Sequence, residues 1–413
     1  ECKATKDRTI MLKVIHTGQE FPSSFSKSVF LAGPSPRSNS EHSWRPEMLR
    51  ELERVGYNGV VFYPEPENGD WSTINLEHSE VAKWEKQGLD MSDVVIFWID
   101  RDISAGRYGL TTNLEYGEQV LSGKTVLGYK KDADKVSSLL NRAEFHHADV
   151  IDTSRMEDVA QYVKNRIGAG AIRYGGERYI PIELWNTVSW QSWVQSQYDA
   201  GNALQWAEVK WILKVGPKKF PLMWVVHVHV FIASEKRAKT NEVVIGRPDV
   251  STVVLLNGDI RSDDLSNIRV VTVREFRSTV NNSESFVYES PGGSSFKEHE
   301  DVYITAAHEV EEETGLVVEP SRILQVGTRQ VASTLSSHKS HLFACLLSDD
   351  EYDELQSDKG VHGVIEETER TYVETSTIKD LLKRDVVDWA QLGMIYQSIG
   401  ALNEKMNEGN PVK

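Results

Sequence analysis

The chain has 413 residues, of which 39% are hydrophobic and 26% are charged, a composition that predicts a globular protein of two or three domains. Its formal net charge of -16 repels polyanions, so we expect no long nucleic acid among its partners, whereas a small nucleotide escorted by Mg²⁺ is compatible with this charge. Because it has two cysteines and no apolar run of about 20 residues, the sequence predicts a cytoplasmic protein without disulfides or a membrane partner.

Apolar runs alternate with helical stretches through the first part of the chain. The runs that read as strands are 10–15, 28–32, 59–63, 94–99 and 125–128, and the helical stretches are 44–55, 75–88, 114–121 and 156–166. Strands that are apolar on both faces and separated by helices predict a parallel sheet covered on both sides. We therefore expect an α/β domain over residues 1–168 with a doubly wound, Rossmann- or flavodoxin-like parallel sheet.

The next region differs in composition, since six of the eleven tryptophans lie between Trp185 and Trp224. A helix is expected over 190–198, and the strand-like runs 208–215 and 222–233 flank a Gly-Pro-Lys-Lys turn that favours a β-hairpin. This pattern predicts a tryptophan-rich connector over residues 169–240. A third domain is expected over 241–413, beginning with strands at 251–256 and 268–273.

Three separated motifs of the first domain resemble the nucleoside 2-deoxyribosyltransferase-like family. They are the strand and Gly-Pro turn 29–34 followed by Ser-Trp-Arg-Pro at 43–46, the Trp-Glu pair 84–85, and the segment 109–117. All three follow strands, at the edge where doubly wound sheets bind ligands. The resemblance covers residues 27–150.

The resemblance implies a role for each matching residue. Glu115 stands at the position of the nucleophile that attacks the anomeric carbon of a nucleoside, and Glu85 matches the acid that protonates the leaving base. The substrate-binding residues that it implies are Gly33, Pro34, Arg45 and Asn113. Gly109 departs from the family, which carries an acidic residue six places before the nucleophile. The alternative is that Glu85 and Glu115 are ordinary helix carboxylates in a binding or inactive domain.

An acidic helix after a glycine-rich loop is the most informative motif of the third domain. Read as a helix that ends at Gly315, the segment 302–314 places Glu309, Glu312 and Glu313 at i, i+3 and i+4, on one face. Carboxylates placed in this way repel one another unless a cation lies between them, and hard oxygen ligands favour Mg²⁺ or Mn²⁺. The alternative is a solvated acidic helix surface.

This segment resembles the Nudix box, with seven residues between Glu300 and His308 and then Glu309, Glu312, Glu313 and Gly315 in register. The resemblance implies an α/β/α sandwich with a mixed sheet and Mg²⁺ bound by the three helix carboxylates. Two departures are the six residues, instead of five, between Gly293 and Glu300, and the histidine in place of an arginine at position 308.

The flanking strand and the turn 288–293 resemble the ADP-ribose pyrophosphatase branch of that family. By this resemblance Arg274, Arg277 and Gly293 line the substrate site, and Glu366 or Glu367 is the general base. For the two arginines the alternative is a strand-end salt bridge.

These resemblances predict a fused protein whose third domain hydrolyses a nucleoside diphosphate linked to another group, such as ADP-ribose. Its first domain would cleave or transfer an N-glycosidic bond, with NAD-related compounds among the candidate substrates. The alternative is a nucleotide-sensing module in which one domain is inert and regulates the other. Both families form oligomers, so the resemblance also implies a homo-oligomer.

Overall fold

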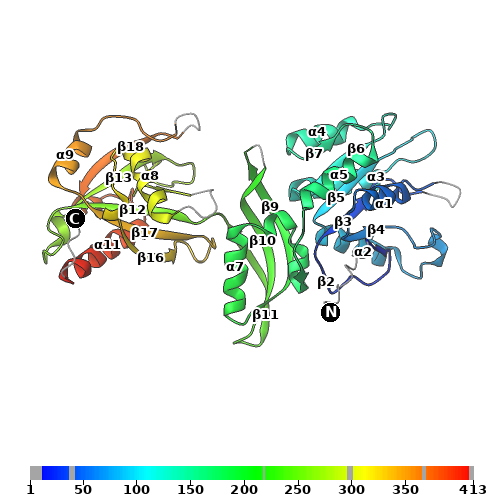
Figure 1. Ribbon diagram of the computed structural model, residues 1–413, viewed down its shortest axis with the longest axis horizontal. Coiled ribbons are helices and arrows are strands. Elements are labelled where there is room, and N and C mark those ends of the chain that lie inside the picture. The colour runs from blue at the N-terminus through cyan, green and yellow to red at the C-terminus, as the bar shows by residue number, and fades with distance from the viewer. Residues whose placement is uncertain (1–11, 37–41, 217–218, 295–300, 365–368, 409–413) are drawn as a thin grey trace, which may run out of the picture. The chain divides into compact units, whose positions relative to one another are not determined.

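The computed structural model describes residues 12–36, 42–216, 219–294, 301–364 and 369–408 (Figure 1). Its internal contacts divide the chain into two units, Glu1–Gly246 and Arg247–Lys413. The predicted fold class is confirmed, since unit 1 contains a parallel α/β sheet and unit 2 a mixed sheet covered by helices. The predicted connector lies within unit 1, and the boundary expected at residue 241 falls inside a strand of that unit.

Six parallel strands form the main sheet of unit 1, in the order β1-β4-β3-β5-β6-β7. Their bounds are Lys13–His16 (β1), Ser28–Ala32 (β3), Val60–Tyr63 (β4), Val94–Ile99 (β5), Thr125–Tyr129 (β6) and Asp149–Ile151 (β7). The three central strands are buried along their whole length, which explains why their sequences are apolar without alternation.

Helices cover both faces of this sheet. Val29 and Leu31 of β3 pack in a core with α1 (Arg45–Arg54) and α5 (Met156–Ile167). Phe30 and Ala32 point to the opposite core, which includes residues of α2 (His78–Met91), α3 (Leu110–Gln119) and α4 (Ser137–Phe145). Alternate side chains of β3 thus enter two different cores, because successive side chains of a strand point to opposite faces of the sheet.

The strand order creates a switch point between β3 and β5. The chain leaves β3 through α1 toward β4, on one side, and leaves β5 through α3 toward β6, on the other side. In doubly wound sheets the crevice at the carboxyl ends of such a strand pair is where ligands bind.

A second, antiparallel sheet of unit 1 has the order β11-β10-β9. The strands β9 (Ala203–Val215) and β10 (Phe220–Ile232) form the predicted hairpin, and β11 (Arg237–Gly246) adds a third strand that the sequence analysis missed. The helix α7 (Val188–Asp199) packs on one face, where the rings of Trp190 and Trp224 are 5.2 Å apart and fully buried. The short elements of this region are β2 (Ser24–Phe25), β8 (Arg173–Tyr174) and α6 (Ile182–Trp185).

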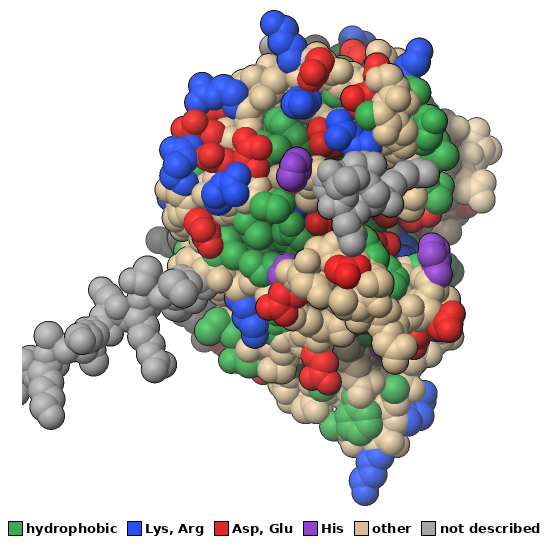
Figure 2. All heavy atoms as spheres, turned by 90° about the vertical axis from the view of Figure 1, so that its right-hand side faces the viewer, with side chains coloured by type: hydrophobic (Ala, Val, Ile, Leu, Met, Phe, Trp, Pro, Cys, Tyr) green, Lys and Arg blue, Asp and Glu red, His purple; other side chains and the backbone are tan. Residues whose placement is uncertain are grey.

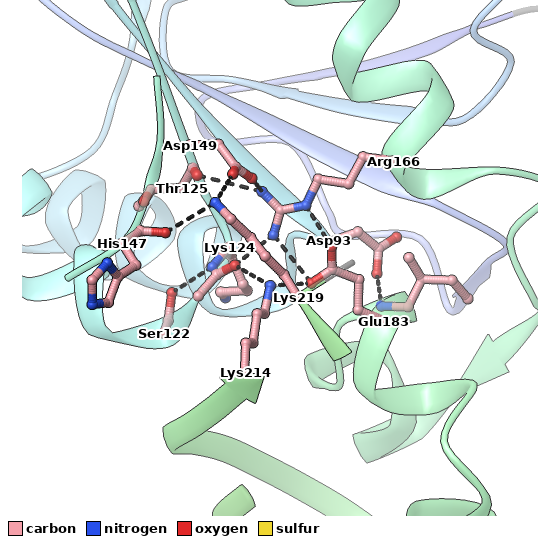
Figure 3. A network of polar contacts seen from close by, with 12 residues as sticks. Asp93, Ser122, Lys124, Thr125, His147, Asp149, Arg166, Glu183, Lys214 and Lys219 are labelled. Carbon is pink, nitrogen blue, oxygen red and sulfur yellow. Dashed lines mark hydrogen bonds and ion pairs between the residues drawn. The ribbon is translucent and has the colours of Figure 1, made fainter. Parts of the chain in front are cut away.

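Ion pairs fasten this second sheet to the edge of the parallel sheet (Figure 3). The buried guanidinium of Arg166, on α5, lies 2.8 Å from Asp149 of β7 and 2.6 Å from Glu183 of α6. Lys214 of β9 pairs with Glu183, and Lys219 pairs with Asp149. These ion pairs link Lys214 and Lys219, at the two ends of the hairpin turn, to Glu183 and to Asp149 of β7, with the guanidinium of Arg166 between the two carboxylates.

Unit 2 is built on a mixed sheet with the order β14-β13-β12-β17-β16, in which β15 also pairs with β12 and β18 with β13. The strands are β12 (Val250–Asn257), β13 (Arg269–Phe276), β14 (Phe286–Glu289), β15 (Gly292–Gly293), β16 (Leu324–Gln330), β17 (Lys339–Leu346) and β18 (Thr371–Thr377). Only β12 and β17 pair in parallel among the described strands of this sheet.

Two hydrophobic cores lie on opposite faces of that sheet. Val253 and Leu255 pack with residues of α8 (Val302–Thr314) and α9 (Asp349–Ser357). Val254 and Leu256 pack with residues of α10 (Ile378–Leu381) and α11 (Trp389–Asn407). The unit is therefore a three-layer α/β/α arrangement.

Candidate functional site

A pocket of about 580 Å³ opens at the switch point of the parallel sheet. Gly33 and Pro34, after β3, form one wall, and Pro64 follows β4. Glu85 of α2 and Glu115 of α3 line the pocket from the helices that follow β4 and β5. The structure therefore brings together side chains from the three sequence motifs that were singled out.

The Gly33–Pro34 turn is shaped by close backbone contacts. A β-carbon at Gly33 would lie 2.3 Å from the carbonyl oxygen of Trp98 and 2.8 Å from the indole ring of Trp44, so no larger residue fits there. The buried Arg45 donates hydrogen bonds to the carbonyl oxygens of Leu31 and Gly33, each at 2.9 Å. It also contacts Ser35 at 3.1 Å and forms an ion pair with Glu65.

These contacts show what Arg45 does in the structure. Most of its N–H groups hold the turn in place, although its side chain also lines the pocket. Asn113 is not among the pocket-lining residues, and its amide oxygen accepts a hydrogen bond from Arg101 at 2.5 Å. Substrate contacts by Gly33, Pro34, Arg45 and Asn113 remain predictions.

The two pocket carboxyl groups influence each other. The pKa of Glu115 is raised to about 7, mainly by burial and also by the nearby charges of Glu85 and Glu118, while the charge of Arg45 opposes the shift. Burial also raises the pKa of Glu85, which Arg45 and His78 oppose. Two carboxyl groups that share a pocket do not readily ionise together, so the pair holds one proton over part of the pH range, and the form with Glu115 ionised and Glu85 protonated is the one that N-glycoside cleavage would require.

We expect the raised pKa of Glu115 to reduce stability as the pH rises. The folded protein binds the proton of Glu115 more tightly than the unfolded chain does. The contribution of this proton to the free energy of unfolding is therefore fully present below about pH 4.5 and is lost as the pH rises through about 7. Glu115→Gln cannot ionise and should unfold at a higher temperature than the wild type at pH 8, with a much smaller difference at pH 5.

Tryptophan fluorescence is a suitable probe for this comparison, because every tryptophan except Trp389 lies in unit 1. An equal change in unfolding temperature at both pH values would show that Glu115 carries no such penalty.

Two further charged residues, the pocket-lining Arg107 and its neighbour Asp100, went unnoticed in the sequence. Asp100 directly follows β5, and burial raises the pKa of its carboxyl group against the charges of Arg107 and Arg45, which line the pocket. Its Oδ1 is buried and has no hydrogen-bond partner among the described residues. The place of Asp100 after the apolar run 94–99 was a usable signal, because polar residues at the carboxyl ends of parallel strands face the ligand crevice. No comparable signal marks Arg107.

In unit 2, the acidic helix α8 adjoins the Gly292–Gly293 strand. It ends at Gly315, whose φ of +74° provides the predicted C-cap. The buried carboxylate of Glu313 accepts a hydrogen bond from the amide of Gly292 at 2.9 Å. A β-carbon at Gly293 would lie 2.6 Å from both carboxylate oxygens of Glu309. Two of the three predicted metal ligands therefore converge on one turn, while Glu312 lies on the exposed surface of the helix.

Several carboxyl groups are gathered around this turn. Burial raises the pKa of Glu313 well above its usual value, and the charges of Glu289, Glu309 and Glu369 raise it further. Among the described residues, no three His, Cys, Asp or Glu side chains are grouped so as to hold a metal ion. Glu300, Glu366 and Glu367 lie outside the described residues, so their predicted roles have no structural account.

The predicted substrate arginines have different surroundings. Arg274 donates to Glu374 at 3.0 Å and lies between the rings of Phe286 and Tyr372, which is the strand-end salt bridge of the alternative interpretation. Arg277 lies 2.6 Å from Glu275, 3.6 Å from Glu369 and 3.8 Å from Glu289. It is thus surrounded by the carboxyl groups near the α8 turn, and a substrate role for either arginine remains a prediction.

Part of unit 1 is similar to a known protein family. Residues 26–133 match the family model described as "Nucleoside 2-deoxyribosyltransferase like". This range contains Gly33, Glu85 and Glu115, so the predicted resemblance of the first domain is confirmed at the level of the family model, which indicates a nucleotide-related role. A search of curated proteins finds no match.

Two solved structures of Shewanella oneidensis NrtR are also similar to part of the chain, each at 20% identity. One, complexed with a 27mer DNA, aligns over 38% of this chain and 63% of its own with a TM-score of 0.27. The other aligns over 38% and 65%, with a TM-score of 0.28. The alignments span less than two-thirds of the NrtR chains. With TM-scores this low, the similarity gives no information about catalysis.

The DNA complex contradicts the prediction that long nucleic acids are excluded as partners. That prediction relied on the net charge alone, which does not determine the local field. On the face shown in Figure 2, acidic and basic side chains are interspersed around a hydrophobic patch, and no single sign of charge dominates. Concerning membranes, none of the helices in the described part of the chain is both long and apolar enough to cross one.

Proposed function

We propose that unit 1 cleaves the N-glycosidic bond of a nucleoside or nucleotide in the pocket at the switch point. The observation that carries this proposal is the pair of carboxyl groups, Glu85 and Glu115, which two different helices present to one pocket and whose pKa values are both raised by burial. The match to the deoxyribosyltransferase-like family model supports the same chemistry.

In this mechanism a carboxylate oxygen of Glu115 attacks the anomeric carbon, and the bond from that carbon to the base nitrogen breaks. Glu85 donates its proton to the departing base, which leaves a glycosyl ester on Glu115. Water then attacks the ester while Glu85 takes up a proton, so that the free sugar and the starting enzyme form. A second base in place of water would give transfer.

A second activity is proposed for unit 2, the hydrolysis of a nucleoside diphosphate derivative such as ADP-ribose. The convergence of Glu309 and Glu313 on the Gly292–Gly293 turn favours it, together with the resemblance to the Nudix box. Glu309 and Glu313 present carboxylate oxygens, the ligand type that Mg²⁺ and Mn²⁺ prefer, and a divalent cation would relieve the repulsion between them. Glu309, Glu312 and Glu313 would hold the ion, which would activate water and neutralise phosphate charge.

The residues of unit 2 have separate proposed roles. Arg277, held by Glu275 and near Glu289, would orient the diphosphate beside the helix. A carboxylate from Glu366 or Glu367 would accept the proton of the attacking water.

One assay separates the two activities. The full chain is incubated with nucleosides, nucleoside monophosphates, NAD and ADP-ribose, in EDTA or in Mg²⁺, and the products are resolved by chromatography and mass spectrometry. We expect free base in both buffers, because the proposed unit 1 chemistry needs no metal, and nucleoside monophosphate from ADP-ribose only with Mg²⁺. If ligands bind but no free base forms, unit 1 is a binding module and the first proposal fails.

A further inference from the structure

The exposed face of α11 in unit 2 lacks the charges expected of a solvated helix surface. Residues 389–403 contain no charged side chain, although 26% of the chain is charged. The buried face of this helix packs in the core on one side of the sheet through Ile395, Ile399 and Leu402. The opposite face therefore presents uncharged residues to solvent, and depletion of charge is typical of the centre of a protein interface.

Two aromatic side chains stand on this exposed face. Trp389 is 88% exposed, whereas no other tryptophan among the described residues is more than 39% exposed. Tyr396 lies seven residues farther along the helix and is 42% exposed. Because seven residues are close to two turns, both rings lie on one side of the helix. Tryptophan is mostly buried in folded proteins and is enriched at binding hot spots, so this side of α11 is a candidate interface.

Each of these aromatic residues is followed four positions later by a glycine on the same side of the helix. Gly393 and Gly400 are exposed, and a β-carbon at either position would meet no atom within 4 Å. Glycine destabilises the interior of a helix relative to alanine, and no contact within the described part of the chain requires a glycine here. The two glycines therefore point to a contact from outside the chain, in which side chains lie directly over the backbone of α11.

We propose that two copies of this chain pair through α11, with the two helices antiparallel about a two-fold axis. The spacing of the two aromatic residues and the two glycines is that of the a and d positions of a coiled coil, with the aromatic residues at d and the glycines at a. When two such helices run antiparallel, Trp389 faces Gly400 of the second copy and Tyr396 faces Gly393 of the second copy. Each ring then fills the space over a glycine, and the same four residues serve both copies, as a two-fold contact requires.

Charge and size favour a second copy as the occupant of this face. The chain has a net charge of -16, so two copies repel one another, and residues 389–403 let them approach without placing like charges in contact. The stripe is roughly 17 Å long from Trp389 to Gly400, at 1.5 Å per residue. Two copies would together bury on the order of 1,000 Å² there, which suits a weak and reversible dimer. A parallel pair would instead set Trp389 against itself and leave the space over each glycine empty.

The test measures the mass of the full chain in solution by sedimentation velocity over a range of concentrations. We expect the wild type to approach twice the monomer mass in the high micromolar range. Added salt should strengthen the association, because it screens the repulsion between two chains of the same charge. Weakening by salt would indicate a contact held by ion pairs and would overturn the uncharged α11 contact. This inference is independent of the proposed function of either unit.

An exchange of ring and glycine makes the test specific. Trp389→Gly removes one ring from each copy, and Gly400→Trp sets two rings against each other, so each variant alone should raise the dissociation constant at least about tenfold. The double variant Trp389→Gly/Gly400→Trp again places a ring opposite each glycine and should recover most of the lost affinity. The control is Val317→Ala, which trims an exposed apolar residue near the end of α8, the helix on the other face of the sheet.

Circular dichroism and the unfolding temperature check that each variant is folded, which we expect because the space around position 400 is open. Association that both single variants weaken, that the double variant restores and that Val317→Ala leaves unchanged supports the α11 contact. Wild-type protein that stays monomeric overturns the proposal and leaves this face to a different partner. An assembly whose mass neither single variant changes, or a double variant as weak as the single ones, also overturns it.

Discussion

Glu115→Gln should reduce the release of free base by at least about 10³-fold, because the amide cannot form the glycosyl ester that the mechanism requires. Substrate binding should largely survive, since glutamine has the shape of the protonated carboxyl group that Glu115 carries below about pH 7. For the same reason, base release by the wild type should fall as the pH drops below about 7, where the nucleophile becomes protonated.

The matched control for this variant is Glu118→Gln, an exposed carboxylate one turn farther along α3. It should keep most of the base release, because it affects Glu115 only by adding negative charge nearby. If Glu115→Gln and Glu118→Gln lost activity to the same extent, the effect would belong to the charge of the helix and Glu115 would not be the nucleophile.

Glu312→Gln should reduce Mg²⁺-dependent hydrolysis of ADP-ribose by at least about 10²-fold and leave base release unchanged, because it removes one of the proposed metal ligands of unit 2. Glu312 is exposed, so its substitution should not disturb packing, in contrast to that of the buried Glu313. The measurement is the rate of nucleoside monophosphate formation as a function of Mg²⁺ concentration, in which a lost ligand raises the concentration needed for half the maximal rate.

Glu311→Gln is the corresponding control, since Glu311 is exposed on the same helix but is not one of the proposed ligands. Equal losses in the two variants would indicate a nonspecific effect of helix charge. Wild-type protein that binds ADP-ribose without cleaving it would favour the alternative in which unit 2 is a nucleotide-sensing domain.

The sequence predicted the parallel sheet well because its strands are buried on both faces and therefore read as continuous apolar runs. It missed β11, because the first six residues of this strand, Arg-Ala-Lys-Thr-Asn-Glu, are polar and mostly exposed at the edge of a three-stranded sheet. The boundary expected at residue 241 falls inside β11 for the same reason, since without that strand the hairpin seemed complete.

The candidate site was predictable where its residues follow strands, as with Gly33, or resemble a family motif, as with Glu85 and Glu115. Asp100 could have been singled out from its place directly after β5, whereas sequence patterns do not show which loop side chains turn inward, so Arg107 could not. Sequence patterns also do not show which hydrogen bonds a guanidinium makes. Arg45 was expected to bind substrate, but it uses most of its donors on the turn that forms the pocket wall.

The most direct test of the central claim is to trap the glycosyl ester on Glu115. The full chain is incubated in EDTA with a 2-fluorinated nucleoside or nucleotide, which slows hydrolysis of the ester, and is then digested and analysed by mass spectrometry. We predict that the peptide containing Glu115 gains the mass of the fluorinated sugar, phosphorylated if the nucleotide was used, and that Glu115→Gln gains none. Release of base without any adduct, or an adduct on another residue, would contradict Glu115 as the nucleophile.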